Sequence, residues 1–251
     1  MIGVIINGCN GKMGLALNEV IQMDHQVEIV AGIDVEDKGY YNFPVYQSIL
    51  ECEKEADVVI DFTFSGITDR VIDACVEKNI PLVLCTTGLS DTQLAHVEEA
   101  SKQIPIVQSY NMSLGINTLV KALQFVAPIL AEEGFDIELV ERHHNQKIDA
   151  PSGTAILLAN AINKSLGNSY EYVYDRSQKR EIRNKKEIGI SAVRGGTIVG
   201  DHEVIFAGKD EIIELNHHAY SKAVFAKGAV AAAKFLIDKK NGRFTMQDVI
   251  A

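Results

Sequence analysis

The chain has 251 residues, of which 47% are hydrophobic and 23% are charged, so it can bury one large or two small cores. This composition excludes a disordered, collagen-like or disulfide-dense protein. Asp and Glu number 34 against 24 Lys and Arg, and the net charge of −10 argues against binding to nucleic acid or to an anionic membrane.

Neither the amino terminus nor the cysteines indicate export. Residues 1–7 lack the basic segment of a signal peptide, and no window of about 18 residues reads as apolar and charge-free enough to cross a bilayer. Cys9, Cys52, Cys75 and Cys85 form no CxxC pair and show no Cys/His spacing typical of metal ligands, so no metal site is predicted. We expect reduced thiols, mostly in the core, and a cytoplasmic protein.

Short β-branched runs alternate with helical stretches in the first half of the chain. The pattern predicts strands at 2–7, 27–33, 57–61, 81–84 and 104–108, and helices at 12–23, 66–78 and 91–103. This alternation is typical of βαβ units, so we predict an α/β fold of the Rossmann type, with a doubly wound parallel sheet. Ligands bind at the carboxyl edge of such sheets.

The second half of the chain follows another pattern. We predict a helix at 113–131, a strand at 136–141, a helix at 152–166, a hairpin at 187–207 turning at Gly195-Gly196, and a strand at 211–217. Such a run predicts an inserted α+β domain with an open mixed sheet. A helix at 221–238 returns to the first domain, which we place at 1–114 and 222–251, with the insertion at 115–221. The basic stretch at 175–187 is expected to be a solvated loop.

A glycine-rich turn follows the first strand and opens the first helix. It reads Asn7-Gly8-Cys9-Asn10-Gly11-Lys12-Met13-Gly14, a G-x-x-G-x-x-G variant of the dinucleotide fingerprint. Its glycines let the backbone approach a pyrophosphate, and the helix N-terminus attracts negative charge. Asp34 lies twenty residues beyond Gly14, where a carboxylate accepts hydrogen bonds from an adenosine ribose. Together these features predict a nucleotide-binding site.

The residues around Asp34 favour NADH over NADPH. The Asp34 carboxylate would repel a 2′-phosphate, and Val35 stands where an arginine would attract one. Lys12 and Lys38 offer charges that could offset this repulsion, which leaves NADPH as the alternative cofactor.

The segment from Glu141 to Thr154 combines two histidines and a lysine with a helix start. It reads Glu-Arg-His-His-Asn-Gln-Lys-Ile-Asp-Ala-Pro-Ser-Gly-Thr. A histidine can transfer a proton near neutral pH, and Lys147 supplies a charge for an anion. Ser152 can cap the next helix, so that the backbone at Gly153 and Thr154 forms a second anion site. This set suits a small dicarboxylate.

A structural explanation of the same residues remains open. Paired histidines are common polar surface residues, and Asp-Ala-Pro-Ser-Gly is ordinary turn chemistry. For the second pair, His217-His218, the structural explanation is favoured. Without a suitably spaced partner, the first pair does not indicate zinc.

The chain resembles the dihydrodipicolinate reductase family, also called 4-hydroxy-tetrahydrodipicolinate reductases, almost from end to end. The most specific match is to the signature E-x-H-H-x-x-K-x-D-A-P-S-G-T. Further matches are the glycine-rich turn, Asp61-Phe62-Thr63, Cys85-Thr86-Thr87-Gly88, Tyr110-Asn111-Met112-Ser113-Leu114-Gly115, Arg194-Gly195-Gly196 and Val199-Gly200-Asp201-His202. The resemblance implies a cytoplasmic homotetramer that uses NADH or NADPH. Its reaction would reduce a cyclic dihydrodipicolinate-type dicarboxylate to tetrahydrodipicolinate in diaminopimelate and lysine biosynthesis.

The resemblance also implies residue roles. His143 matches the proton donor, Lys147 matches a second catalytic residue, and His144, Gly153 and Thr154 match substrate-binding positions. Residues 1–114 and 222–251 would bind the dinucleotide, and 115–221 would bind substrate and mediate oligomerisation. The implied cofactor-binding residues are Gly8, Cys9, Asn10, Gly11, Lys12, Met13, Asp34, Cys85, Thr86, Thr87, Ser109, Tyr110, Asn111 and Met112.

Three positions depart from the family pattern. Cys85 stands where glycine is frequent, Met112 where phenylalanine is common, and Val35 where some members carry arginine. Two other functions remain as alternatives, namely a different Rossmann-fold amino-acid-type dehydrogenase and a non-enzymatic NAD(P)H sensor. Neither has an evident need for His-His-x-x-Lys followed by Pro-Ser-Gly-Thr.

Overall fold

The alternating strands and helices form a parallel sheet. In the computed structural model, which describes residues 1–251 apart from the side chain of Gln178, this sheet has the order β12-β6-β5-β4-β1-β2-β3. Its strands are β1 (Ile2–Asn7), β2 (Val27–Ile33), β3 (Val45–Tyr46), β4 (Val58–Asp61), β5 (Leu82–Leu84), β6 (Pro105–Gln108) and β12 (Gly242–Phe244). All neighbours pair in parallel. The chain runs outward from β1 to β3 and returns to β4 beside β1, which creates a topological switch point.

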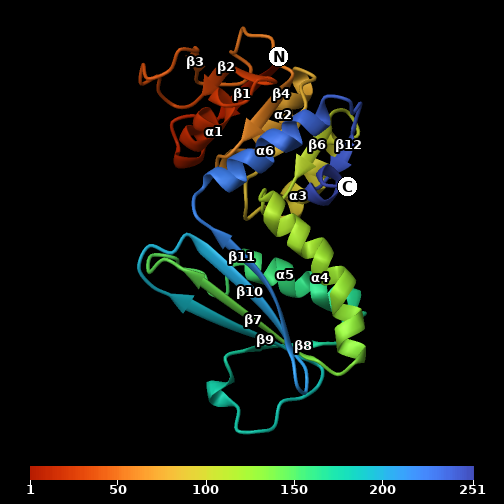
Figure 1. The fold of residues 1–251 in the computed structure, drawn as a ribbon. Coiled ribbons are helices and arrows are strands. Elements are labelled where there is room, and N and C mark those ends of the chain that lie inside the picture. Colours follow the sequence, from red (N-terminus) through yellow and green to blue (C-terminus); the bar gives the residue numbers. More distant parts are fainter. The chain divides into compact units, whose positions relative to one another are not determined.

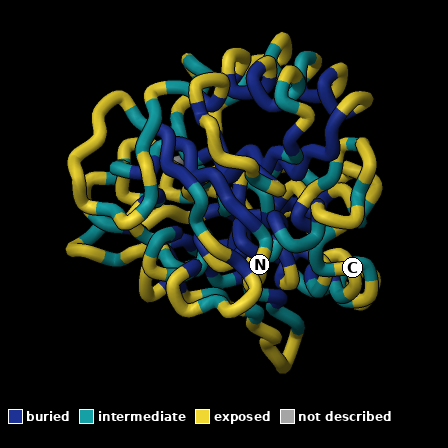
Figure 2. The backbone as a smooth tube through the Cα atoms, turned by 90° about the horizontal axis from the view of Figure 1, so that it is seen from above, coloured by how far each residue is buried: buried dark blue, intermediate teal, exposed yellow. Residues whose placement is uncertain are grey.

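Helices cover both faces of this sheet (Figure 1). They are α1 (Lys12–Gln22) and α6 (Ala223–Leu236) on one face, and α2 (Thr68–Glu77) and α3 (Asp91–Ala100) on the other; the short α7 (Met246–Val249) follows β12. Val4 and Ile6 of β1 pack in the core under α1 and α6, and Ile5 packs in the core under α2 and α3. This alternation follows from the two-residue period of a strand. Strands β4, β5 and β6 are buried along their whole length. Figure 2 colours the buried residues of the chain dark blue and the exposed ones yellow. The predicted doubly wound α/β fold is confirmed.

A mixed sheet of five strands, in the order β11-β10-β7-β9-β8, forms the second part of the structure. Its elements are β7 (Asp136–His143), β8 (Glu171–Tyr174), β9 (Glu187–Arg194), β10 (Gly200–Ala207) and β11 (Ile212–Ala219), with helices α4 (Leu114–Glu132) and α5 (Gly153–Ser165). Both helices pack on the sheet through a core that includes Leu123, Leu158 and Phe206. Alternate residues of β7 and β10 face away from this core and are partly exposed. The mixed α+β character is therefore confirmed.

The contacts divide the chain into two compact units. The first comprises Met1–Leu114 and Lys222–Ala251, and the second comprises Gly115–Ser221. All four cysteines are free and buried, which confirms their interpretation as core residues.

The predicted hairpin at 187–207 is wrong. Strands β9 and β10 are not neighbours, because β7 lies between them, parallel to β9 and antiparallel to β10. The antiparallel partner that follows β10 in the chain is β11, in a register that runs from Gly200 opposite Ala219 to Ala207 opposite Ile212. Alternation of polar and apolar residues determines which face of a strand is buried, but it does not identify the neighbouring strand.

Helix α4 overturns the expectation that no segment is apolar enough to cross a membrane. Its 18-residue window has a mean hydropathy of 1.5, and 33% of that window is buried. The only charged side chain between Leu114 and Ala131 is that of Lys121. The helix is apolar partly because Leu119, Leu123 and other residues on one side pack into the core of the second unit. A helix that packs into a protein core can therefore be as long and as apolar as one that crosses a membrane.

The basic stretch at 175–187 is not simply solvated. Arg183 donates hydrogen bonds to Glu138 Oε1 and Asp136 Oδ1, both at 2.9 Å, and its side chain is only 16% exposed. Arg176, in the 3₁₀ turn Arg176–Gln178, pairs with Glu187. These acidic partners lie on β7 and β9. Those on β7 are more than forty residues from Arg183 in the chain, so the sequence of the loop alone does not predict them.

Candidate functional site

The glycine-rich turn between β1 and α1 is tight enough to require glycine. Gly8 has a φ of 83°, a left-handed conformation that side chains disfavour. A Cβ atom at Gly14 would lie 2.3 Å from the carbonyl oxygen of Cys9 and 2.4 Å from that of Gly8. Gly11 occupies the N-cap of α1 without a side-chain cap, so the first backbone N–H groups of this helix face the turn. The geometry fits a pyrophosphate.

Asp34, just beyond the end of β2, is bonded to this turn. Its Oδ2 atom accepts a hydrogen bond of 2.8 Å from the N–H group of Asn10, and Oδ1 accepts one of 2.8 Å from the N–H group of Val35. The Asn10 amide donates to the carbonyl oxygen of Glu36 at 2.7 Å, while its buried Oδ1 atom has no partner among the described residues. The carboxylate therefore lies beside the turn, as recognition of an adenosine ribose requires.

A buried carboxylate joins the ends of three neighbouring segments at the same edge. Asp61, the last residue of β4, accepts hydrogen bonds from Asn7 Nδ2 at 2.7 Å, Thr63 Oγ1 at 2.7 Å and Thr86 Oγ1 at 2.6 Å. Burial raises the pKa of the Asp61 carboxyl although these hydrogen bonds oppose the shift. Through these hydrogen bonds, Asp61 fixes the positions of Asn7, Thr63 and Thr86 at the predicted cofactor edge.

The remaining predicted cofactor residues follow β5 and β6. Cys85 lies in the core, and burial raises the pKa of its thiol well above its usual value, so the residue can offer its backbone but not a thiolate. Met112 is 2% exposed and packs in the same core. Thr87 is exposed, and Tyr110 is 54% exposed. Ser109 Oγ accepts a hydrogen bond from the N–H group of Asn111 at 3.3 Å, which closes a short turn after β6.

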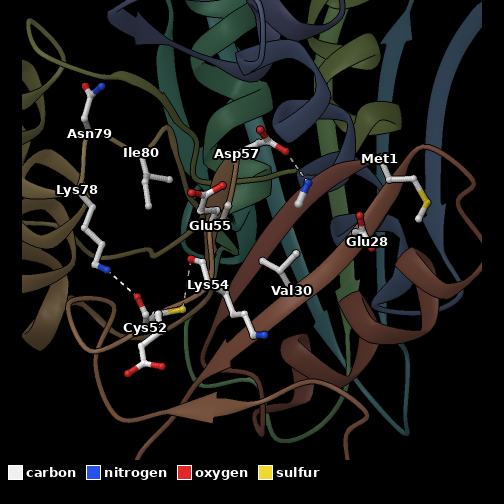
Figure 3. Close-up of a pocket in the computed structure, with 13 residues that line it drawn as sticks. Met1, Glu28, Val30, Cys52, Lys54, Glu55, Asp57, Lys78, Asn79 and Ile80 are labelled. Carbon is white, nitrogen blue, oxygen red and sulfur yellow. Dashed lines mark hydrogen bonds between the residues drawn. The ribbon is translucent and has the colours of Figure 1, made fainter.

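Another cavity, of about 750 Å³, lies at the opposite edge of the sheet (Figure 3). It is lined by the beginning of β1, part of β2 and the segments before β4 and β5. Hydrogen bonds at its wall join Lys78 Nζ to the carbonyl oxygen of Cys52 and the N–H group of Gly3 to Asp57 Oδ2, each at 2.7 Å, and Cys52 Sγ to the carbonyl oxygen of Lys54 at 3.9 Å (Figure 3). Cofactors of such sheets bind at the carboxyl edge, so this cavity is not the candidate cofactor site.

In the second unit, the signature segment begins on β7 and ends at α5. His143 is the last residue of β7, and its Nδ1 atom lies 2.5 Å from Glu141 Oε2. Glu141 is fully buried, and both of its oxygens also accept hydrogen bonds from Arg194, the last residue of β9. Burial raises the pKa of Glu141, but the hydrogen bonds from Arg194, His143 and Ser152 outweigh it and hold the pKa below its usual value. The carboxylate beside His143 is therefore ionised.

Ser152 caps α5, as its sequence predicts. Its Oγ atom accepts a hydrogen bond of 3.1 Å from the N–H group of Ala155, and its own N–H group donates to Glu141 Oε1 at 3.0 Å. Gly153 is exposed and Thr154 is half-buried in the first turn of the helix. A helix N-terminus with these small residues can accept a carboxylate.

Lys147 and His144 lie in the loop between β7 and α5. Lys147 Nζ lies 2.8 Å from Asp149 Oδ1, and this hydrogen bond lowers the pKa of the Asp149 carboxyl. The N–H group of Lys147 donates to the carbonyl oxygen of His144 at 3.2 Å. Both side chains are partly exposed, as ligand-binding residues should be. The ammonium group of Lys147 can bind an anion if its ion pair with Asp149 breaks.

His202 on β10 was missed as a neighbour of the signature segment. Its ring stands edge-on to that of His143 with centroids 5.2 Å apart, and its Nε2 atom lies 3.1 Å from Ser152 Oγ. Burial, reinforced by the nearby His143, lowers the pKa of His202 to about 4, so this imidazole is neutral near pH 7. The signal in the sequence was alternation, because His202 shares the buried face of β10 with Val204 and Phe206.

The structure thus brings the predicted residues together in two groups. One lies along the carboxyl edge of the parallel sheet and contains the predicted cofactor-binding residues. The other lies where β7 meets α5 and contains His143, His144, Lys147, Gly153 and Thr154. The first group combines a glycine-rich turn, a helix N-terminus and a carboxylate, and the second offers a histidine, a lysine and a helix start.

Comparisons with known proteins cover both units. Residues 2–112 match the family model described as dihydrodipicolinate reductase, N-terminus, and residues 115–250 match the model of its C-terminus. A 4-hydroxy-tetrahydrodipicolinate reductase of Caldanaerobacter subterraneus subsp. tengcongensis is 52% identical over 250 residues, or 100% of this chain and 98% of that protein. One from Clostridium novyi is 46% identical over the same shares of both chains.

A solved structure has the same fold. The dipicolinate-bound dihydrodipicolinate reductase from Paenisporosarcina sp. TG-14 aligns over 99% of each chain with a TM-score of 0.81 and 24% sequence identity. Together, the two family models and the full-length relatives establish that this chain belongs to the dihydrodipicolinate reductase family of NAD(P)H-dependent oxidoreductases.

Proposed function

We propose that this chain is the 4-hydroxy-tetrahydrodipicolinate reductase of a diaminopimelate and lysine pathway. The reaction converts the hydroxylated cyclic dicarboxylate, NAD(P)H and a proton into tetrahydrodipicolinate, NAD(P)⁺ and water. The observation that carries the proposal is the position of His143 beside an ionised Glu141, in a chain whose relatives of this name match it over its full length.

The cofactor would lie along the carboxyl edge of the parallel sheet. Gly8 to Met13 would hold the pyrophosphate through backbone N–H groups, and Asp34 would bind the adenosine ribose. The segments Cys85 to Thr87 and Ser109 to Met112 would contact the nicotinamide half. When bound, the reduced nicotinamide supplies the hydride. The close packing at Gly14 and the fixed position of Asp34 support this assignment.

His143 would donate the proton that accompanies reduction. Its Nδ1 atom faces Glu141, so Nε2 is the ring atom left to meet substrate. General acid catalysis of this kind typically contributes about 10²–10⁴-fold to a rate.

Two anion sites would orient the dicarboxylate. Lys147 would bind one carboxylate as a point charge, together with His144. The N-terminus of α5 at Gly153 and Thr154 would bind the other, where the helix dipole favours negative charge.

We infer that NADH is preferred over NADPH. Both oxygens of Asp34 already accept backbone hydrogen bonds, so the carboxylate cannot rotate away from a 2′-phosphate without losing them. Val35 is 85% exposed beside it and offers no charge. A cavity of about 310 Å³ is lined in part by Val35 and Arg70, and a cation there would reduce this preference.

We further propose a homotetramer and a cytoplasmic location. Val193, Ile212 and Ile213 are 44%, 63% and 37% exposed on strands of the mixed sheet, and burying them against other copies would be favourable. The biosynthetic role of the family supports the location. Light scattering after size exclusion would test the assembly.

The activity is tested by nicotinamide oxidation with substrate made in situ by a dihydrodipicolinate synthase. The proposal predicts oxidation that depends on the synthase, with the larger kcat/KM for NADH. Protein that binds NADH but oxidises neither cofactor would refute the reductase and favour a sensor.

A further inference from the structure

The Glu141 carboxylate is the most heavily bonded group of the signature segment. It has no exposed surface. Oε2 accepts hydrogen bonds from His143 Nδ1 at 2.5 Å and Arg194 Nη1 at 2.8 Å, and Oε1 accepts from Arg194 Nη2 at 2.7 Å and the N–H group of Ser152 at 3.0 Å. A buried carboxylate with four donors is both ionised and immobile.

Arg194 fixes the carboxylate through hydrogen bonds to both of its oxygens. Its Nη1 atom donates to Glu141 Oε2 and its Nη2 atom donates to Oε1. Nη2 also donates to the carbonyl oxygen of Asp149 at 2.6 Å. The hydrogen bond to Glu141 raises the pKa of Arg194, although burial opposes the shift. The bidentate pair removes rotational freedom from Glu141, so the position of its Oε2 atom determines where His143 Nδ1 must lie.

The opposite ring nitrogen of His143 lies beside a glycine. An ideal Cβ atom placed on Gly200, the first residue of β10, would lie 3.0 Å from His143 Nε2. Because residue 200 has no side chain, this residue does not crowd Nε2. Nδ1 is committed to Glu141, and Nε2 is the atom through which a proton can pass.

The same carboxylate connects the histidine with the start of α5. It binds the N–H group of Ser152, and Ser152 Oγ in turn caps the helix at Ala155. Proton donor and helix start are therefore held by one group, and a substrate carboxylate at the helix would lie at a constant distance from His143.

We propose that Glu141, clamped by Arg194, is a positioning residue for proton transfer: it keeps Nδ1 of His143 as a hydrogen-bond donor, stabilises the protonated ring and leaves Nε2 to protonate the substrate. The catalytic part of this inference rests on the proposed reductase function. The charged or titratable groups that contact His143 are Glu141 on its own strand and His202 on β10, while Arg194 on β9 acts through Glu141.

The test uses Glu141→Gln, which removes the charge but keeps the shape. Because a protonated His143 is required, activity falls as pH rises through the His143 titration. Without the carboxylate the protonated ring is less stable, so this falling limb of kcat should move to lower pH, by at least about one pH unit. We expect kcat to fall by roughly 10²-fold or more, with the Kd for NADH unchanged. Glu203→Gln, which breaks the pair between Glu203 and Arg142 on the same sheet, is the matched control and should keep the wild-type profile.

A second readout does not depend on activity. Deuterium exchange at the ring carbon between the two nitrogens, followed by mass spectrometry, reports the titration of His143 directly. Its midpoint should fall in Glu141→Gln and in the double variant Glu141→Gln, Arg194→Gln, which leaves no unpaired buried charge if the single variant folds poorly. An unchanged midpoint in a folded variant would overturn the proposal. Failure of the reductase function itself would appear separately, as wild-type protein without synthase-dependent oxidation.

Discussion

Replacing Gly14 by alanine tests how closely the glycine-rich turn is built. The new methyl group would lie 2.3 Å and 2.4 Å from two backbone carbonyl oxygens, whereas ordinary contact begins at 3.4 Å. Each oxygen, or the helix itself, must therefore move by about 1 Å. Backbone atoms cannot swing aside as a flexible side chain can. The hydrogen bond from Gly8 N–H to the Ile33 carbonyl, 2.8 Å long, would be stretched by the same movement.

Overpacking of this kind costs roughly 1–3 kcal/mol of folding free energy. In a protein of this size each kcal/mol lowers Tm by about 2–4 °C, so calorimetry should show a loss between about 2 and 12 °C. The first N–H groups of α1 move with the turn, and we expect the Kd for NADH to rise by about tenfold or more, equivalent to about 1.4 kcal/mol.

Gly11→Ala is the graded control in the same turn. Its Cβ atom would lie 3.2 Å from the carbonyl oxygen of Gly8, so a movement of a few tenths of an ångström suffices. Its effect on Tm and on NADH binding should be clearly smaller than that of Gly14→Ala. Equal effects of the two variants, or wild-type NADH affinity in Gly14→Ala, would refute the argument that this turn is close-packed around a pyrophosphate.

Four other predictions follow from the two candidate groups. His143→Gln should lower kcat by about 10²–10⁴-fold with little change in NADH affinity, and an unchanged kcat would remove His143 from the mechanism. Lys147→Ala should lower kcat and raise KM for the dicarboxylate, whereas a defect confined to NADH binding would contradict its placement. Val35→Arg should shift the ratio of kcat/KM values towards NADPH, because a guanidinium would offset the charge of Asp34; an unchanged ratio would argue against this adenosine site. Because the pKa of His202 is lowered from 6.5 to about 4, the unfolded chain binds this proton more readily, so folding free energy should be lost as pH falls from 6.5 towards 4. His202→Asn should flatten that part of a denaturant-based stability profile, and an equally steep loss would assign it to other groups.

Much of the parallel sheet could be predicted because each strand carries its own signal. The runs at 2–7 and 27–33 are short, β-branched and bounded by turn residues, and they coincide with β1 and β2. Strand β3 has only two residues and β12 only three, so neither is long enough to show a period. The position of β7 between β9 and β10 depends on contacts between distant residues, which alternation within one strand cannot reveal.

In the candidate site too, local features could be predicted from the sequence and contacts between distant residues could not. The Gly and His-Lys motifs are local, so His143 and Lys147 could be recognised in the sequence as they stand. The partners that control His143 are not local: Arg194 is 53 residues beyond Glu141, and Ser152 contacts His202 across 50 residues. Their importance follows from burial, since an ionised Glu141 with no exposed surface requires donors from other strands.

The central claim is that this chain transfers a hydride to the cyclic dicarboxylate, and the fate of that hydrogen tests it most directly. We would supply NADH carrying deuterium at the transferred position, with substrate made in situ by the synthase, and analyse the product by mass spectrometry. The account predicts tetrahydrodipicolinate carrying one deuterium, formed by the wild-type protein and far more slowly by His143→Gln. Product without deuterium, or no product from protein that binds NADH, would contradict it.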